Sequence, residues 1–306
     1  MDEVYFVEKI QNIINTYQAK ENLSPDFLLI LLGPTASGKT RLAVQLAKEI
    51  GAEILSADSR QVYKRLDIGT GKDLQEYQGV PHHLINIIEP TEKYNVNRFK
   101  EDFFRIYDRL IKENKPRILC GGTGSYIQSI LQASPYSVIP KNESFHLEHK
   151  LVNKEELIRQ LNTFTIPEDF QIDWHNHKRL VRALEIVTYL ENHPLPQNPQ
   201  RLVTNYLILG LNPDLETRKR KIDARLSKRL ADGLIQEVQG LLEEGLSHEQ
   251  LQWFGLEYKY CSLYLIGEMT LEEFNDKLKT EIHRFAKRQM TYFRKMEKDG
   301  LAIHWL

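Results

Sequence analysis

The chain of 306 residues has little cysteine, almost no net charge and no long apolar segment. Its two cysteines, Cys120 and Cys261, lie far apart and offer no metal-ligand spacing, which is typical of a protein from a reducing cytoplasm. The formal net charge is −1, so a nucleic-acid surface would need local clustering of the 41 lysine and arginine residues. No signal peptide or transmembrane helix is expected, because no apolar run is long enough. We therefore expect a cytoplasmic protein without a membrane partner.

The chain does contain an alternation of apolar strand patterns with amphipathic helix patterns. Strands are predicted at 27–32, 53–55, 116–120 and 206–211, and residues 80–87 are predicted to be a loop followed by a strand. Helices are predicted between them, up to about residue 50, over 97–113 and from about 125. This alternation is typical of an α/β fold with a parallel sheet and helices on both faces, and the phosphate-binding motif described below makes it a P-loop fold.

Composition divides the chain into regions. Residues 1–24 have apolar positions at helical spacing and predict an N-terminal helix. Residues 132–200 are polar and predict a small, mainly helical insertion, with helices near 154–163 and over 177–191. Residues 25–131 and 201–306 are predicted to form the core, which ends in a helical C-terminal region. Helices in that region are predicted after Asp214 and at about 234–245, 257–266, 271–280 and 281–298.

The first predicted strand is followed by a phosphate-binding loop and then by a helix. The loop has the pattern G-x-x-x-x-G-K-[ST] and consists of Gly33, Pro34, Thr35, Ala36, Ser37, Gly38, Lys39 and Thr40. Loop amides and the helix N-terminus converge on an anion, Lys39 adds a positive charge, and the Thr40 hydroxyl can bind Mg²⁺. The motif therefore predicts a di- or triphosphate ligand without deciding whether that ligand is a nucleotide.

Asp58 comes directly after the second predicted strand, beside this loop, where parallel sheets gather ligands. An aspartate in that position can also be a cap or a Mg²⁺ ligand of a kinase-type site. Further motifs follow along the chain: Ser56-Ala57-Asp58-Ser59-Arg60-Gln61-Val62-Tyr63, Asp67-Ile68-Gly69-Thr70, Val80-Pro81-His82-His83-Leu84, Gly121-Gly122-Thr123-Gly124-Ser125-Tyr126, Lys178–Glu185 and Ala286–Thr291.

With these motifs in this order, the sequence resembles the tRNA dimethylallyltransferases, also called isopentenyltransferases. The resemblance covers residues 27–131 and 175–296. It implies transfer of the dimethylallyl group of dimethylallyl diphosphate to N6 of an adenosine in tRNA, at position 37 next to the anticodon, with release of diphosphate. The implied partners are dimethylallyl diphosphate and the anticodon arm of tRNA, the implied cofactor is Mg²⁺, and we expect a monomer.

The resemblance also assigns catalytic roles. Asp58 is implied to be the general base that accepts the N6 proton. Lys39, Thr123, Arg225 and Mg²⁺ on Thr40 are implied to neutralise charge that develops on the departing diphosphate. The phosphate loop is then expected to hold this leaving group, and it need not bind ATP. Arg225 belongs to a run of basic residues after Asp214. The alternative interpretation of most of this run is a charged helix face exposed to solvent.

For tRNA, the resemblance implies contacts at two stretches, and a basic face of the last helix adds one candidate residue. The first stretch is Asp58, Ser59, Arg60 and Gln61, the second is Lys178, Arg179, Leu180, Val181 and Arg182, and the candidate on the last helix is Arg288. The last helix has an inward stripe of Ile282, Ala286, Met290 and Phe293, and the basic residues opposite it predict either a phosphate-contact surface or an ordinary charged face. His82 and His83 are expected to be structural, because the motif does not require a catalytic role for them.

The sequence departs from the family pattern at several places. The segment between Tyr126 and Arg179 is shorter than the usual insertion, Lys221 stands for a second arginine, and Glu257 stands for a glycine. The short insertion leaves open an enzyme that prenylates free AMP or ATP. A small-molecule kinase would share the phosphate loop, and an RNA-binding module without activity would share the fold.

Overall fold

The computed structural model describes residues 25–196 and 200–306, so the expected helix at 1–24 lies outside the described residues. Two compact units are present, each with its own core. The larger unit contains the described residues up to Leu131 together with Val203–Leu306, and the smaller unit is Gln132–Leu202. No helix in the described ranges is long and apolar enough to cross a bilayer.

The larger unit is built on a six-stranded sheet in which every pair of neighbours is parallel. The strand order is β3-β2-β4-β1-β5-β6, and the strands are β1 (Leu28–Leu32), β2 (Glu53–Ser56), β3 (His82–His83), β4 (Arg117–Gly121), β5 (Tyr206–Gly210) and β6 (Ile303–Trp305). The predicted parallel α/β sheet is confirmed.

The two edge strands of the sheet differ from the expectation. The strand expected within 80–87 consists of His82–His83 alone, because Leu84 and Asn86 adopt positive φ angles of 65° and 55° that interrupt an extended chain. The strand β6 was not predicted, since three residues are too short to show alternation.

Apolar residues on both faces of the sheet are buried under helices. In β1, Leu28, Ile30 and Leu32 belong to one core, with α3 (Val96–Lys112), α4 (Gly124–Leu131) and α12 (Leu271–Lys298). Leu29 and Leu31 point to the other core, against α2 (Lys39–Ile50). This double burial explains why the strand is a continuous apolar run.

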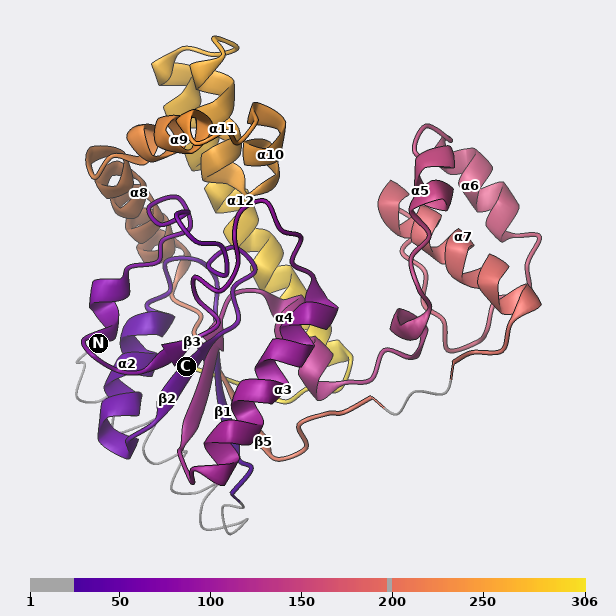
Figure 1. The fold of residues 1–306 in the computed structure, drawn as a ribbon, viewed down its shortest axis with the longest axis horizontal. Helices are drawn as coiled ribbons and strands as arrows, with labels where there is room; N and C mark the ends of the chain where they lie inside the picture. The colour runs from indigo at the N-terminus through magenta and orange to yellow at the C-terminus, as the bar shows by residue number, and fades with distance from the viewer. Residues whose placement is uncertain (1–24, 197–199) are drawn as a thin grey trace. The chain divides into compact units, whose positions relative to one another are not determined.

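The C-terminal region of the larger unit is helical (Figure 1). Its helices are α8 (Leu215–Ala231), α9 (Leu234–Glu243), α10 (His248–Trp253), α11 (Leu256–Leu265) and α12. The expected break at 280–281 is wrong, because the buried stripe of Phe274, Leu278 and Ile282 continues in phase through one helix. The short helix α10 was not predicted.

The smaller unit is mainly helical. It contains the 3₁₀ turn η2 (Pro135–Val138) and the helices α5 (Glu143–Glu148), α6 (Lys154–Leu161) and α7 (His177–Asn192). The helices expected near 154–163 and over 177–191 are confirmed, whereas α5 was not predicted. Leu157 and Leu161 of α6 pack with Leu180 and Leu184 of α7 in the core of this unit.

Candidate active site

The phosphate loop connects the end of β1 to the start of α2. Gly38 is the N-cap of α2 and has a φ of 90°, a left-handed conformation that glycine adopts without a steric penalty. The N-cap makes no side-chain hydrogen bond to the first turn of α2. Amides at such a helix start are available to an anion, whose charge the helix dipole also favours.

The ends of β2 and β4 position Asp58 near this loop. Gly121 permits their close approach, because a Cβ atom there would lie 2.2 Å from the carbonyl oxygen of Ala57. The Thr123 amide donates a 3.1 Å hydrogen bond to that same carbonyl. Asp58 follows directly, and its Oδ1 atom accepts hydrogen bonds from the amides of Arg60 (2.9 Å) and Gln61 (3.4 Å). The carboxylate orientation is therefore fixed by the backbone.

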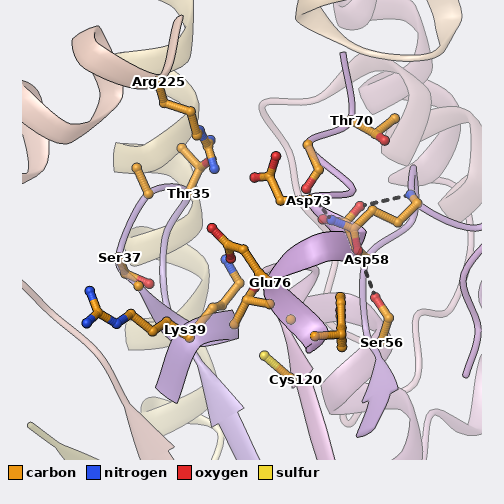
Figure 2. A pocket seen from close by; sticks show the side chains of 18 of the residues that line it. Thr35, Ser37, Lys39, Ser56, Asp58, Thr70, Asp73, Glu76, Cys120 and Arg225 are labelled. Atoms are coloured by element: carbon orange, nitrogen blue, oxygen red, sulfur yellow. Dashed lines mark hydrogen bonds between the residues drawn. The ribbon is translucent and has the colours of Figure 1, made fainter. Parts of the chain in front are cut away.

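The loop and the strand ends enclose a cavity of about 280 Å³. Figure 2 shows Thr35, Lys39 and Arg225 along one side, with Asp58 and Thr70 on the other. The lining residues are Thr35 to Arg41, Ser56, Asp58, Gln61, Thr70, Gly71, Asp73, Glu76, Tyr77, Cys120, Gly121, Lys221 and Arg225. Predicted phosphate and acceptor residues from distant parts of the sequence thus share one cavity.

Three of the residues predicted for diphosphate binding or catalysis are near the cavity without lining it. Gly33 and Pro34 are buried at the start of the loop. The Thr123 hydroxyl accepts a hydrogen bond from the Ser59 amide at 3.1 Å, one residue beyond Asp58. The structure therefore gives Thr123 a contact that supports the acceptor segment.

Two cations of the cavity are poorly solvated. Burial lowers the pKa of Lys39, and the nearby Arg225 lowers it further. Burial, followed by repulsion from Arg229, lowers the pKa of Arg225 to about 10. The Arg225 guanidinium also donates a hydrogen bond to the hydroxyl of Thr35 in the phosphate loop. Both positive charges are costly without a counter-charge, so an anion between them is strongly favoured.

Carboxylates also line the cavity, and two of them were not predicted. Glu76 lies in the short 3₁₀ turn η1 (Leu74–Tyr77), and Asp73 is the residue before this turn. Burial and the neighbouring Asp73 raise the pKa of Glu76. No motif marks these residues, because a 3₁₀ turn of four residues has no distinctive sequence pattern.

Gln289 joins the phosphate loop to the strand β4. Its Oε1 atom accepts a 2.8 Å hydrogen bond from the Thr35 amide, and its Nε2 atom donates a 3.0 Å bond to the Gly122 carbonyl. Gln289 lies within the motif at 286–291, and that motif alone predicts no role for it. Its separation of 254 residues from Thr35 hides the contact from any local pattern.

A second set of contacts fixes the loop that carries Thr70 and Gly71. The Glu237 carboxylate accepts hydrogen bonds from the amides of Ile68 (2.6 Å) and Gly69 (3.0 Å). Arg229 donates to the Gly69 carbonyl (3.3 Å) and to Glu257 (2.7 Å). Glu257 is therefore the ion-pair partner of a buried arginine.

We expect Glu257→Gln to lower the free energy of unfolding by roughly 3 kcal/mol, because it leaves the Arg229 charge buried without its partner. Urea unfolding followed by circular dichroism measures this change. The control is Asp232→Asn, which breaks the exposed Lys228–Asp232 pair and should cost less than about 1 kcal/mol. Equal changes in the two variants would contradict the role given to Glu257.

The predicted RNA-contact stretch at 178–182 lies in the smaller unit, where its residues differ in exposure. Lys178 and Arg179 have exposed side chains. Leu180 and Val181 are buried in the core of the unit, so their side chains are not exposed to a ligand and act in packing. Arg182 is mostly buried and donates to Glu185 and to the Ile139 carbonyl, which is a structural role.

Other predicted residues are found where their spacing places them. Arg288 is exposed on α12, opposite the buried stripe, and lies 3.9 Å from Glu281. His83 pairs with Glu53 at 2.6 Å, and the His82 ring packs on Tyr77. Among the residues described, no group of three or more histidine, cysteine or acidic side chains could hold a metal ion. The contacts of His82 with Tyr77 and of His83 with Glu53 are structural, as expected.

The parallel sheet, the phosphate loop with its buried cations and the facing carboxylate define a P-loop α/β protein with an anion site. The sequence model of the family described as IPP transferase matches residues 61–296. This match spans more than half of the chain, and the chain therefore belongs to the IPP transferase family. The predicted resemblance and the expectation of a prenyltransferase are confirmed.

Individual relatives agree with this assignment. The chain is 45% identical over 292 residues to a Bacteroides fragilis protein named tRNA dimethylallyltransferase 2, covering 92% of this chain and 93% of the relative. A Shewanella sediminis protein of the same name is 43% identical, with coverages of 91% and 92%. A solved tRNA isopentenylpyrophosphate transferase from Bacillus halodurans is 32% identical, with a TM-score of 0.66 and coverages of 92% and 89%.

A further solved structure supports the fold. It is a eukaryotic dimethylallyltransferase described as acting on tRNA, with 24% identity, a TM-score of 0.71 and coverages of 91% of this chain and 73% of that chain. At this identity, the similarity concerns the arrangement of the sheet and its helices.

Proposed function

We propose that the protein transfers the dimethylallyl group of dimethylallyl diphosphate to N6 of an adenosine in tRNA and releases diphosphate. Dimethylallyl transfer to tRNA is supported by the family and by the names of the relatives. The observation that carries the proposal is the position of Asp58, whose carboxylate shares one cavity with the phosphate loop and Arg225. An acceptor base and a diphosphate donor can thus meet there.

In this reaction, the bond between the dimethylallyl carbon and the diphosphate oxygen breaks, and its electron pair stays on the diphosphate. The adenine N6 forms the new bond to carbon and loses a proton to Asp58. Lys39, Arg225 and the loop amides stabilise the negative charge on the leaving group. Because both cations are poorly solvated, their attraction for this charge is stronger than it would be in water.

The donor set of the cavity suits Mg²⁺. Thr40 contributes a hydroxyl at the start of α2, and the carboxylate of Glu76 lines the same cavity. These are hard oxygen ligands, and the lack of a closed cluster within the described ranges suits an ion that keeps waters and binds phosphate oxygens. We propose that Thr40 holds Mg²⁺, which would supply charge neutralisation to the diphosphate when bound.

We further propose that the acceptor is the adenosine at position 37, next to the anticodon, and that a monomer contacts the anticodon arm. Exposed basic residues on α7 and α12, among them Lys178, Arg179 and Arg288, support contacts with RNA phosphates. A cytoplasmic location is supported by Cys120 and Cys261, which are both buried as free thiols.

Radiolabelled dimethylallyl diphosphate tests the proposal when it is incubated with the protein, Mg²⁺ and either unmodified tRNA or AMP. We expect label on tRNA alone, and none on a tRNA whose position 37 is not adenosine. Label only on AMP would identify the free nucleotide as acceptor. Turnover of ATP without transfer of label to either acceptor would overturn the proposal in favour of a kinase.

A further inference from the structure

One large aromatic side chain beside the site has no role in the transfer described above. Trp253 is the last residue of α10, and 51% of it is exposed. Tyr63 and Phe254, which are buried, meet the indole edge-to-face at centroid distances of 5.9 and 5.4 Å. These contacts fix the orientation of the indole and leave about half of it open to solvent.

Arg60 connects this indole to the acceptor carboxylate. Its guanidinium carbon lies 4.6 Å from the centre of the Trp253 ring, a cation–π distance. Its backbone amide donates the 2.9 Å hydrogen bond to Asp58 Oδ1. A single residue therefore contacts both the carboxylate that would meet the acceptor adenine and the exposed indole. No other large exposed apolar side chain of the described residues has such a link.

We propose that Trp253 is a stacking platform for a nucleobase that adjoins the adenine at Asp58, an inference that rests on the proposed function. An adenine that leaves its stack to reach a protein carboxylate uncovers the face of its neighbour. An aromatic ring replaces that lost stacking for any base, because every base has a π-face. The Arg60 guanidinium over the ring adds a positive charge that suits the adjoining phosphate.

The platform distinguishes RNA from a free nucleotide. AMP has one base, which Asp58 would engage, and no neighbour for the indole. Trp253 would therefore contribute to the KM for an RNA acceptor and leave the KM for dimethylallyl diphosphate unchanged. It does not touch the reacting atoms, so kcat at saturating RNA should also stay unchanged.

Steady-state kinetics with an unmodified anticodon stem–loop RNA test this inference. We expect Trp253→Ala to raise the KM for the stem–loop about tenfold, which corresponds to the stacking of one base. Trp253→Phe should restore most of the affinity, since it keeps an aromatic face. The control is Leu271→Ala, which removes a similarly exposed apolar side chain at the start of α12 and should change nothing.

Fluorescence gives a readout that is independent of turnover. Trp174→Phe combined with Trp305→Phe leaves Trp253 as the only one of the three tryptophans. We expect the stem–loop to quench this emission, and an abasic nucleotide on one side of the acceptor adenosine to abolish the quenching. The inference would be overturned if quenching persisted both with the abasic nucleotide on the 5′ side of the adenosine and with it on the 3′ side.

The two proposals fail in different ways. Normal transfer to the stem–loop by the wild-type protein, with an unchanged KM in Trp253→Ala, overturns the stacking platform alone. A wild-type protein that neither binds nor modifies the stem–loop overturns the proposed function, and the platform with it.

Discussion

Replacing Asp58 by asparagine lowers kcat for dimethylallyl transfer by at least about a hundredfold, because the amide cannot accept the N6 proton. The substitution preserves the local structure, since an asparagine Oδ1 can still accept the hydrogen bonds from Arg60 and Gln61. It also removes a negative charge that stabilises the Lys39 ammonium. We therefore expect the affinity for inorganic diphosphate to stay the same or to rise slightly. Steady-state transfer measures kcat, and calorimetry with inorganic diphosphate measures the affinity.

Asp73→Asn is the matched control for this prediction. It removes the same charge from the same cavity and leaves the acceptor carboxylate in place. A loss of turnover in Asp58→Asn that Asp73→Asn does not share would be due to proton transfer and not to the change in cavity charge. If Asp58→Asn weakens diphosphate binding as much as it slows turnover, Asp58 is a ligand for the diphosphate and the assignment as base is wrong.

The sequence predicted those parts of the site that are continuous in the chain. The phosphate loop lies between one strand and one helix, so the conformation of Gly38 and the place of Lys39 at the start of α2 are set within a few residues. Asp58 could be predicted because the carboxyl ends of parallel strands meet at the same edge of a sheet. The buried stripe of α12 could be predicted because it repeats at helical spacing.

The remaining parts depend on tertiary contacts that leave no local pattern. Gln289 reaches the phosphate loop from α12, and Glu257 contacts Arg229 from a different helix. Burial separated Leu180 and Val181 from their exposed neighbours, although all belong to one motif. A motif shows which residues occur together, whereas the packing of the helix decides which side chains can contact a ligand.

Arg225→Ala should be the most damaging substitution on the diphosphate side of the cavity. The guanidinium points at the phosphate loop, where it contacts the Thr35 hydroxyl, and burial makes its charge costly without an anion. Its removal deletes a charged donor to the developing negative charge, an effect of about a hundredfold or more on kcat. Because the same donor also contacts the intact donor substrate, diphosphate affinity should fall with it. This joint loss distinguishes Arg225 from Asp58.

Two further variants separate charge from geometry at this position. Arg225→Lys keeps a positive charge but cannot present two parallel donors to a phosphate, so we expect it to recover only a small part of the lost rate. Arg220→Ala removes an exposed arginine from the same helix and should leave transfer unchanged. Steady-state transfer of radiolabelled dimethylallyl diphosphate gives kcat, and the rise in Tm with inorganic diphosphate reports binding. Full activity in Arg225→Ala would show that Lys39 and the loop amides neutralise the leaving group without it.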